Sequence, residues 1–213
     1  FVYAGSNSGQ TLTDGIDRTL GALDWFKVRN LAGENHILWD TARTGGLETN
    51  TTADQATVGR DKATYITQNN GSVTLNFGGN GVFNNSGDAL VSWTFRKQAK
   101  FFDVVTYTGT GSTQTINHNL GATPGFIIVK NTSTITNWIT YHRSLGATKG
   151  IVLNSTAVPA TNSGYWNDTD PTSTQFTVGA SSLSNRSGDT MVAYLFAHDA
   201  GGFGTAGTDN VIS

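Results

Sequence analysis

One segment occurs twice in this chain, and this repeat constrains the fold more than any other feature. Residues 173–198 align without a gap on residues 72–97, at an offset of 101. The identical positions, numbered in the first copy, are Ser72, Gly78, Asn84, Ser86, Gly87, Asp88, Val91 and Phe95. A repeat of this period in a chain of 213 residues predicts two tandem domains. We therefore expect a first domain at residues 1–100 and a second at residues 101–213.

The beginnings of the two domains also match. FVYAGSNSGQTLT at residues 1–13 corresponds to VTYTGTGSTQTIN at residues 105–117. The first domain then has DGIDRTLG where the second has only HNLG, and such an insertion predicts a surface loop. A glycine-rich stretch at residues 200–207 predicts a connector near the C-terminus, and the β-favouring residues after it lead us to expect a longer native polypeptide.

The central strands of the two domains are expected to align at the same offset. WFKVRN at residues 25–30 then corresponds to FIIVKN at residues 126–131, which matches Trp25 with Phe126. The following aromatic strands match Trp39 with Tyr141.

Short β-favouring runs alternate with turns along the whole chain. The turns are rich in Gly, Asn, Ser and Thr, and residues 61–69 form the only segment in which a helix deserves consideration. Each domain thus offers about seven short strands and no substantial helix, as in a β-sandwich. The fold class that we predict is all-β, with two tandem, jelly-roll-like β-sandwich domains.

The repeat contains an Asn-x-Ser-Gly-Asp sequence followed by an aromatic strand. Asn and Asp side chains bond the local backbone and Gly allows a left-handed residue, so residues 84–88 and 185–189 predict turns. In the strand that follows, Val91, Trp93 and Phe95 share one face. We expect this face to be core, and the second copy, apolar on both faces, to be covered on both.

Composition excludes several classes of partner. Charged residues make up 13% of the chain, the net charge is −2, and there is no cysteine. Without a basic run the chain has no electrostatic footprint for nucleic acid. No apolar stretch reaches the roughly 18 residues of a membrane helix, so we expect no membrane insertion. The absence of cysteine excludes disulfides and thiolate metal sites.

No motif indicates a reaction, a metal or a cofactor. The four histidines lack metal-ligand spacing, and the chain has no Gly-x-Ser-x-Gly elbow. Asp168 and Asp170 offer oxygens suited to calcium, but their loop lacks the glycine and distal glutamate of an EF-hand, and an Asx turn before Pro171 is favoured. Glutamate occurs only at Glu34 and Glu48, so the repeat preserves no glutamate-based site. We predict no catalytic residues and no enzyme.

The second domain resembles a known family. YTGTGSTQTINHNLGATPGFIIVKN, NWITYHRSLGATKGIVLN and FTVG followed by NRSGDTMVAYLFAHDAGGFG are similar to a repeated β-domain of tailed-bacteriophage virion proteins, notably tail-fibre and other particle-surface proteins of marine and cyanobacterial phages. The resemblance covers the second domain and, more loosely, the first, which has LDWFKVRN for TPGFIIVKN and no clear counterpart of Trp138. It implies a structural or adhesion module on the virion surface, with other virion proteins and copies of itself as partners.

Aromatic residues near loops are the candidates for carbohydrate recognition. Tyr165 and Trp166 lie in a polar loop and are the strongest pair, followed by Trp138 with Tyr141. A sugar's apolar face stacks on an indole ring, so these residues would suit a host surface glycan, although core packing is the alternative for each of them. A carbohydrate-binding module is therefore the alternative to the virion structural protein, and a glycan-degrading enzyme is the less favoured third.

Overall fold

The computed structural model describes residues 1–76 and 84–198. The chain divides into two compact units, Phe1–Arg96 and Lys97–Ser213, so the boundary follows Arg96 rather than residue 100. The predicted connector at residues 200–207 lies outside the described residues, and so does the repeated Gly78. Each unit has its own hydrophobic core.

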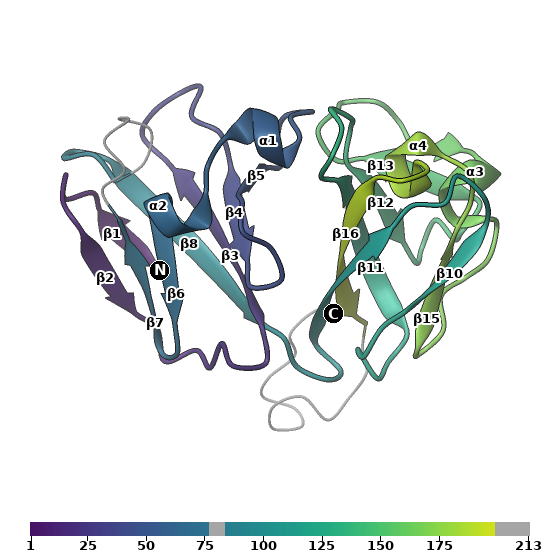
Figure 1. Ribbon diagram of the computed structural model, residues 1–213, viewed down its shortest axis with the longest axis horizontal. Helices are drawn as coiled ribbons and strands as arrows, with labels where there is room; N and C mark the ends of the chain where they lie inside the picture. Colours follow the sequence, from purple (N-terminus) through teal and green to yellow (C-terminus); the bar gives the residue numbers. More distant parts are fainter. Residues whose placement is uncertain (77–83, 199–213) are drawn as a thin grey trace. The chain divides into compact units, whose positions relative to one another are not determined.

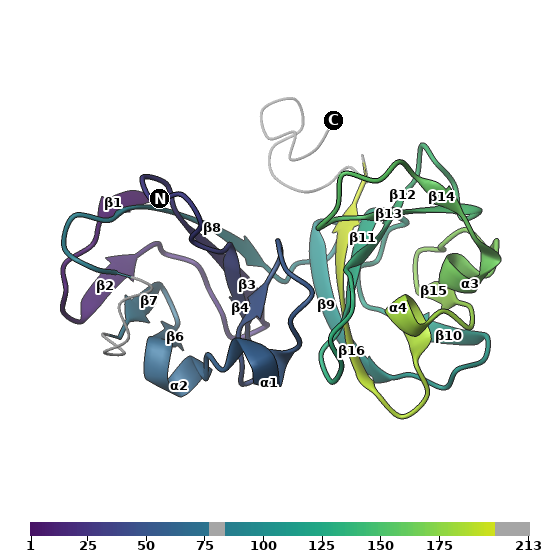
Figure 2. The ribbon, with the colours of Figure 1, turned by 90° about the horizontal axis from the view of Figure 1, so that it is seen from above.

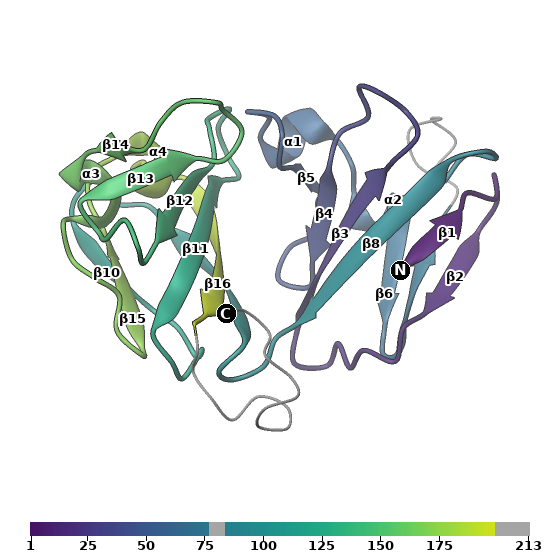
Figure 3. The ribbon, with the colours of Figure 1, turned by 180° about the vertical axis from the view of Figure 1, so that it is seen from behind.

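The first unit is an antiparallel β-sandwich (Figures 1 and 3). Among the described residues, its larger sheet has the strand order β1-β8-β3-β4-β5 and its smaller sheet the order β2-β7-β6. The strands are β1 (Val2–Ala4), β2 (Gln10–Thr13), β3 (Ala22–Val28), β4 (Ile37–Asp40), β5 (Leu47–Glu48), β6 (Ile66–Asn69), β7 (Ser72–Leu75) and β8 (Ala89–Arg96). Apolar residues of both sheets form one core, with Trp39 packed edge-to-face on Phe26.

The second unit is also a two-layered antiparallel structure (Figure 2). Its described strands form a larger sheet of order β14-β13-β12-β11-β16-β9 and a pair β10-β15. The strands are β9 (Phe102–Thr108), β10 (Gln114–Asn117), β11 (Pro124–Asn131), β12 (Ile139–His142), β13 (Lys149–Val152), β14 (Ala160–Thr161), β15 (Gln175–Val178) and β16 (Thr190–Ala197). The all-β sandwich prediction is confirmed in both units.

The helices of the described residues are single turns of four residues each. They are α1 (Gln55–Val58), α2 (Lys62–Tyr65), α3 (Ser163–Trp166) and α4 (Ser182–Asn185). Each begins after an Asp, Asn or Ser whose side chain accepts a backbone N–H of the first turn, the usual satisfaction of a helix N-terminus. Helix α2 lies inside residues 61–69, the segment in which the sequence indicates a possible helix.

The larger sheets of the two units share a strand order but not the alignment predicted for their central strands. Strands β9-β16-β11-β12-β13 follow the order of β1-β8-β3-β4-β5. Trp25 of β3 pairs with Trp93, whereas the strand partner of Tyr194, the counterpart of Trp93, is Ile128. Trp25 therefore corresponds to Ile128, and the predicted match with Phe126 is wrong. A β-bulge between Pro124 and Phe126 accounts for one of the two residues of displacement, because it adds a residue that an ungapped alignment does not include.

The aromatic face of β8 points away from the core of the first unit. Leu90 belongs to that core, and strand alternation puts Val91, Trp93 and Phe95 on the opposite face. Trp93 is 47% exposed. The prediction that this face forms the core is therefore wrong.

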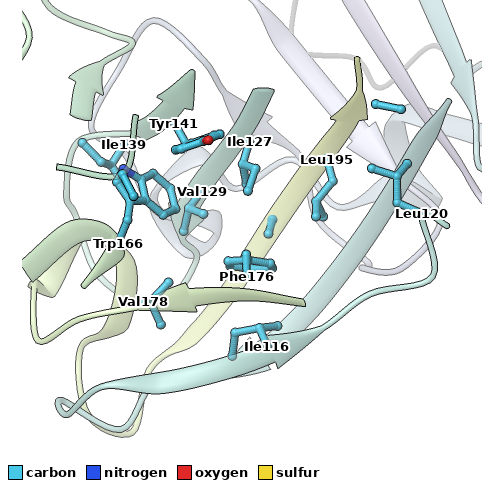
Figure 4. Close-up of a cluster of buried hydrophobic side chains, with 13 residues drawn as sticks. Ile116, Leu120, Ile127, Val129, Ile139, Tyr141, Trp166, Phe176, Val178 and Leu195 are labelled. Atoms are coloured by element: carbon cyan, nitrogen blue, oxygen red, sulfur yellow. The ribbon is translucent and has the colours of Figure 1, made fainter. Parts of the chain in front are cut away.

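Strand β16 is buried on both faces, as predicted. Ala193 and Leu195 belong to the core of the second unit (Figure 4). Tyr194 and Phe196 lie on the other face, where both rings pack on Phe102. Complete burial of rings of this size contributes about 1.5–3 kcal/mol each.

The second of the Asn-x-Ser-Gly-Asp turns is fastened to a distant loop by its asparagine. Asn185 is fully buried. Its Oδ1 accepts the backbone N–H of Thr110 (2.8 Å) and the Nε2–H of Gln114 (2.7 Å). Its Nδ2 donates to the carbonyls of Ser112 and Gly179. The turn closes on the backbone N–H of Asp189, which donates to the carbonyl of Arg186, while the Asp189 carboxylate accepts from Asn131 and Thr134 rather than from the local backbone. The asparagine connects the turn to the β9–β10 loop.

The first unit repeats this connection. Oδ1 of Asn84 accepts the backbone N–H of Ser6, and its Nδ2 donates to the carbonyl of Ser8. The loops approach the turns so closely that a Cβ at Gly5 or Gly109 would collide with a backbone carbonyl of the turn. This close approach is the physical reason for the two repeated glycines.

The insertion of the first unit is not a simple surface loop, because its arginine enters the core. The Arg18 guanidinium donates to Asp24 (Nη2–Oδ1 2.8 Å) and also to Asp14. Gln68 Nε2 (2.6 Å) and Thr94 Oγ1 (2.7 Å) complete the hydrogen bonds to the Asp24 carboxylate. We call these five residues the Asp24 network.

The second unit has apolar side chains at the position that the Asp24 network occupies in the first unit. Asp24 pairs with Thr94 in the sheet, and the pair at the same position in the second unit is Ile127 with Leu195. Burial acts to raise the pKa of Asp14, but the hydrogen bonds from Arg18 and from the backbone N–H of Ile16, together with the charge of Arg18, outweigh burial and lower that pKa. The ionised form is thereby favoured.

Candidate functional site

The aromatic residues predicted to bind carbohydrate lie inside the second unit. Trp138 is 0% exposed, Trp166 1% and Tyr141 3%. Trp166 packs edge-to-face on Tyr141 at 5.9 Å (Figure 4). Buried rings have no face left for a sugar from solvent, so the structure corrects the sugar-binding prediction at these three positions. Only Tyr165 is partly exposed, with the rest of its ring against the core.

Local hydrogen bonds explain why this polar loop turns its tryptophan inward. Asn162 caps α3 by accepting the backbone N–H of Gly164, and Asn167 ends the helix in the left-handed conformation. The single turn between them directs Trp166 onto the core. Asp170 accepts hydrogen bonds from the Tyr141 hydroxyl and the backbone N–H of Ala147, so its carboxylate has a structural role here.

Burial and the Asp170 carboxylate raise the pKa of Tyr141 to about 12, with Arg143 opposing the shift. The phenol therefore stays protonated at neutral pH and donates its hydrogen bond.

His118 is buried in the second unit. Nδ1 of His118 accepts the backbone N–H of Leu120, and burial lowers the pKa of its imidazole while Asp103 opposes the shift. Asp103 itself is engaged by Lys97 (2.8 Å) and by the backbone N–H of Asn119 (2.7 Å). The neutral ring stacks on Phe176. His118 therefore has a structural role in the second unit.

Within residues 1–76 and 84–198, no group of three or more His, Asp or Glu side chains is placed to hold a metal ion. In the same ranges, no helix has the length and apolarity needed to cross a membrane.

The first unit exposes an aromatic surface that the sequence assigned to the core. Trp25 and Trp93 are direct partners on neighbouring strands, with ring centroids 6.2 Å apart in an edge-to-face arrangement. Phe1 (57% exposed) and Val2 (67%) lie on the same sheet, and a hollow of about 280 Å³ beside Trp93 is also lined by Phe95. We call this surface the Trp93 face.

The second unit has a pocket of about 430 Å³ at the ends of β11, β12 and β16. Its lining residues are Gly125, Phe126, His142, Arg143, Ser144, Phe196, Ala197 and His198. We call it the Arg143 pocket. Sequence reasoning missed it because its residues come from three segments that only the sheet brings together.

The fold and these surfaces define a tandem β-sandwich protein with an exposed aromatic face and a separate polar pocket. Residues 1–208 match the model of a family described as a domain of unknown function, DUF7483. The chain belongs to this family. No curated protein and no solved structure matches the chain.

Proposed function

We propose that this chain is a structural segment of a tail fibre or other surface appendage of a tailed bacteriophage, with a role in host attachment. Its location is then the outside of the virion, and its partners are other virion proteins and copies of itself. The observation that carries the proposal is the likeness of residues 107–131, 137–154, 176–179 and 185–204 to repeated β-domains of such proteins. Two all-β units in tandem, with a polar surface of few charges, suit this role.

The chemistry of the two surface sites supports binding. The Trp93 face presents indole rings, and the Arg143 pocket combines aromatic walls with hydrogen-bonding side chains. Apolar walls with a few placed polar groups are typical of recognition sites. We do not propose an enzymatic activity for this chain.

An antibody raised against the purified chain tests the proposal. It is expected to label intact tailed particles from the infected host in electron micrographs, at a fixed position on the particle. The control is the same antibody after preincubation with the chain. Chain that stays with the cell fraction, and particles that remain unlabelled, would contradict the proposal.

Carbohydrate binding through the Trp93 face is a second candidate function, favoured by the exposure of the Trp93 ring. Sugars stack their apolar face on such a ring, and a well-placed aromatic contact is worth about 0.5–1.5 kcal/mol. W93A is therefore expected to weaken binding to a panel of bacterial surface polysaccharides by up to about tenfold. The measurement is biolayer interferometry with immobilised polysaccharides.

The matched control for W93A is L31A, because Leu31 is exposed to a similar extent (42% against 47%) in the same unit. L31A is expected to bind as the unmodified chain does. Equal affinities of W93A and the unmodified chain, or no binding by either, would rule out this second function.

A further inference from the structure

The side chains that line the Arg143 pocket favour a negatively charged ligand. Arg143, His142, Ser144 and His198 supply hydrogen-bond donors, and no Asp or Glu of residues 1–76 and 84–198 is among its lining residues. Arg143 is exposed, and within the described part of the chain its guanidinium has no hydrogen-bond or ion-pair partner. A free guanidinium beside a pocket without acids favours an anionic ligand.

The hydrogen bonding of His142 orients a second donor. The backbone N–H of Ser144 donates to Nδ1 of His142 at 3.2 Å. Because Nδ1 accepts this hydrogen bond, Nε2 is the ring nitrogen that donates, and it remains available to a ligand. Asp170 and Arg143 act in opposite directions on the pKa of Tyr141, and the Asp170 carboxylate accepts hydrogen bonds from Tyr141 and Ala147.

An aromatic wall adds an apolar surface to these donors. The Phe126 ring lies 6.1 Å from that of Phe196 and 6.2 Å from the His142 ring. Gly125 shapes the pocket because a Cβ at this position would collide with the Cβ of His198. A volume of about 430 Å³ is within the range of small-ligand sites.

The first unit lacks the same combination. The position of Phe126 is occupied there by Leu23, and that of His142 by Asp40. Arg43 binds the Asp40 carboxylate (2.6 Å), so the corresponding region of the first unit is an internal ion pair.

We propose that the Arg143 pocket binds a carboxylate-bearing sugar such as a hexuronic acid. The planar guanidinium of Arg143 pairs with the carboxylate through two parallel hydrogen bonds. Nε2 of His142 and Oγ of Ser144 bond the ring hydroxyls, and the Phe126 ring covers the apolar face of the pyranose. A bare inorganic anion would leave the aromatic wall unused. The site is independent of the Trp93 face and of the place of the chain on a particle.

Isothermal titration calorimetry of the full chain tests the proposal with sodium glucuronate, glucose, sodium acetate and inorganic phosphate as separate ligands. Glucuronate is expected to bind at least tenfold more tightly than the other three. R143Q removes the charge but keeps the backbone hydrogen bond from residue 143 to Gly125, and it is expected to weaken glucuronate binding at least tenfold. F126L, which introduces the residue of the first unit, is expected to weaken it as well.

The matched control is R29Q, because Arg29 is an exposed arginine of the first unit. R29Q is expected to bind glucuronate like the unmodified chain, and thermal unfolding verifies that all variants are folded. Glucose binding as tightly as glucuronate would overturn the proposal, as would phosphate or acetate binding equally well. Folded R143Q with unchanged affinity would overturn it too. None of these results bears on the labelling of particles, so the two proposals fail separately.

Discussion

R18M is expected to destabilise the first unit by about 3–5 kcal/mol, the usual cost of removing one partner from a buried ion pair. The Arg18 side chain is 3% exposed, and the carboxylates of Asp14 and Asp24 are 1% and 0% exposed. Methionine keeps the apolar stem but leaves two buried carboxylates without their cation. Gln68 and Thr94 still donate to Asp24, but they carry no compensating charge.

Hydrogen exchange detected by mass spectrometry measures this loss in each unit of the intact chain. Peptides from β3 and β8 are expected to lose protection in R18M, while those from β11 and β16 keep it. R29M is the matched control, because Arg29 is exposed and lies in the same unit.

The double variant R18M/D24I separates charge from volume. Isoleucine is the residue at the equivalent position of the second unit, and apolar replacement of buried ion pairs is often neutral or stabilising. The double variant is expected to recover part of the stability that R18M loses. A double variant less stable than R18M, or R18M indistinguishable from R29M, would contradict the importance of the Asp24 network.

N185A is expected to destabilise the second unit by about 2–4 kcal/mol, because each buried group that loses its partner costs about 1–3 kcal/mol. Four hydrogen bonds end at this side chain. Those with Thr110, Ser112 and Gln114 connect the turn before β16 to the β9–β10 loop and the start of β10, and the fourth connects it to Gly179 after β15. Alanine leaves the backbone N–H of Thr110 and the carbonyl of Gly179 without that partner. Chemical denaturation and exchange of the β9 and β16 peptides measure the effect.

Two controls accompany N185A. N119A changes an exposed asparagine of the same unit and is expected to be within about 0.5 kcal/mol of the unmodified chain. N84A removes the corresponding asparagine of the first unit, so its effect is expected in the β1 and β8 peptides instead. Loss of protection spread evenly over both units in either variant would show that the two turns do not act locally.

The candidate sites were less predictable than the fold. Trp166 and Tyr165 stand in a polar loop, which indicates exposure, but one capped turn of helix puts Trp166 in the core. Trp93 stands in an apolar strand, which indicates burial, but it faces solvent. For the Arg143 pocket the sequence contains no local signal, because strands far apart in the chain supply its residues.

The sequence by itself determined the all-β class, the two units and the turns, because these depend on local composition and on a repeat of residue types. It also determined which residues of β8 share a face, because strand alternation is local. Only the tertiary structure decided which face is inside. Ser92 and Thr94 look like solvent-facing positions until Arg18 and Asp24, distant in the chain, make the interior of the first unit polar at that point. The orientation is the same in the second unit, where Ala193 and Leu195 face the core without such a network. In both units the smaller sheet packs on this face of the larger sheet, and in the first unit the opposite face, with Trp93, is left at the surface.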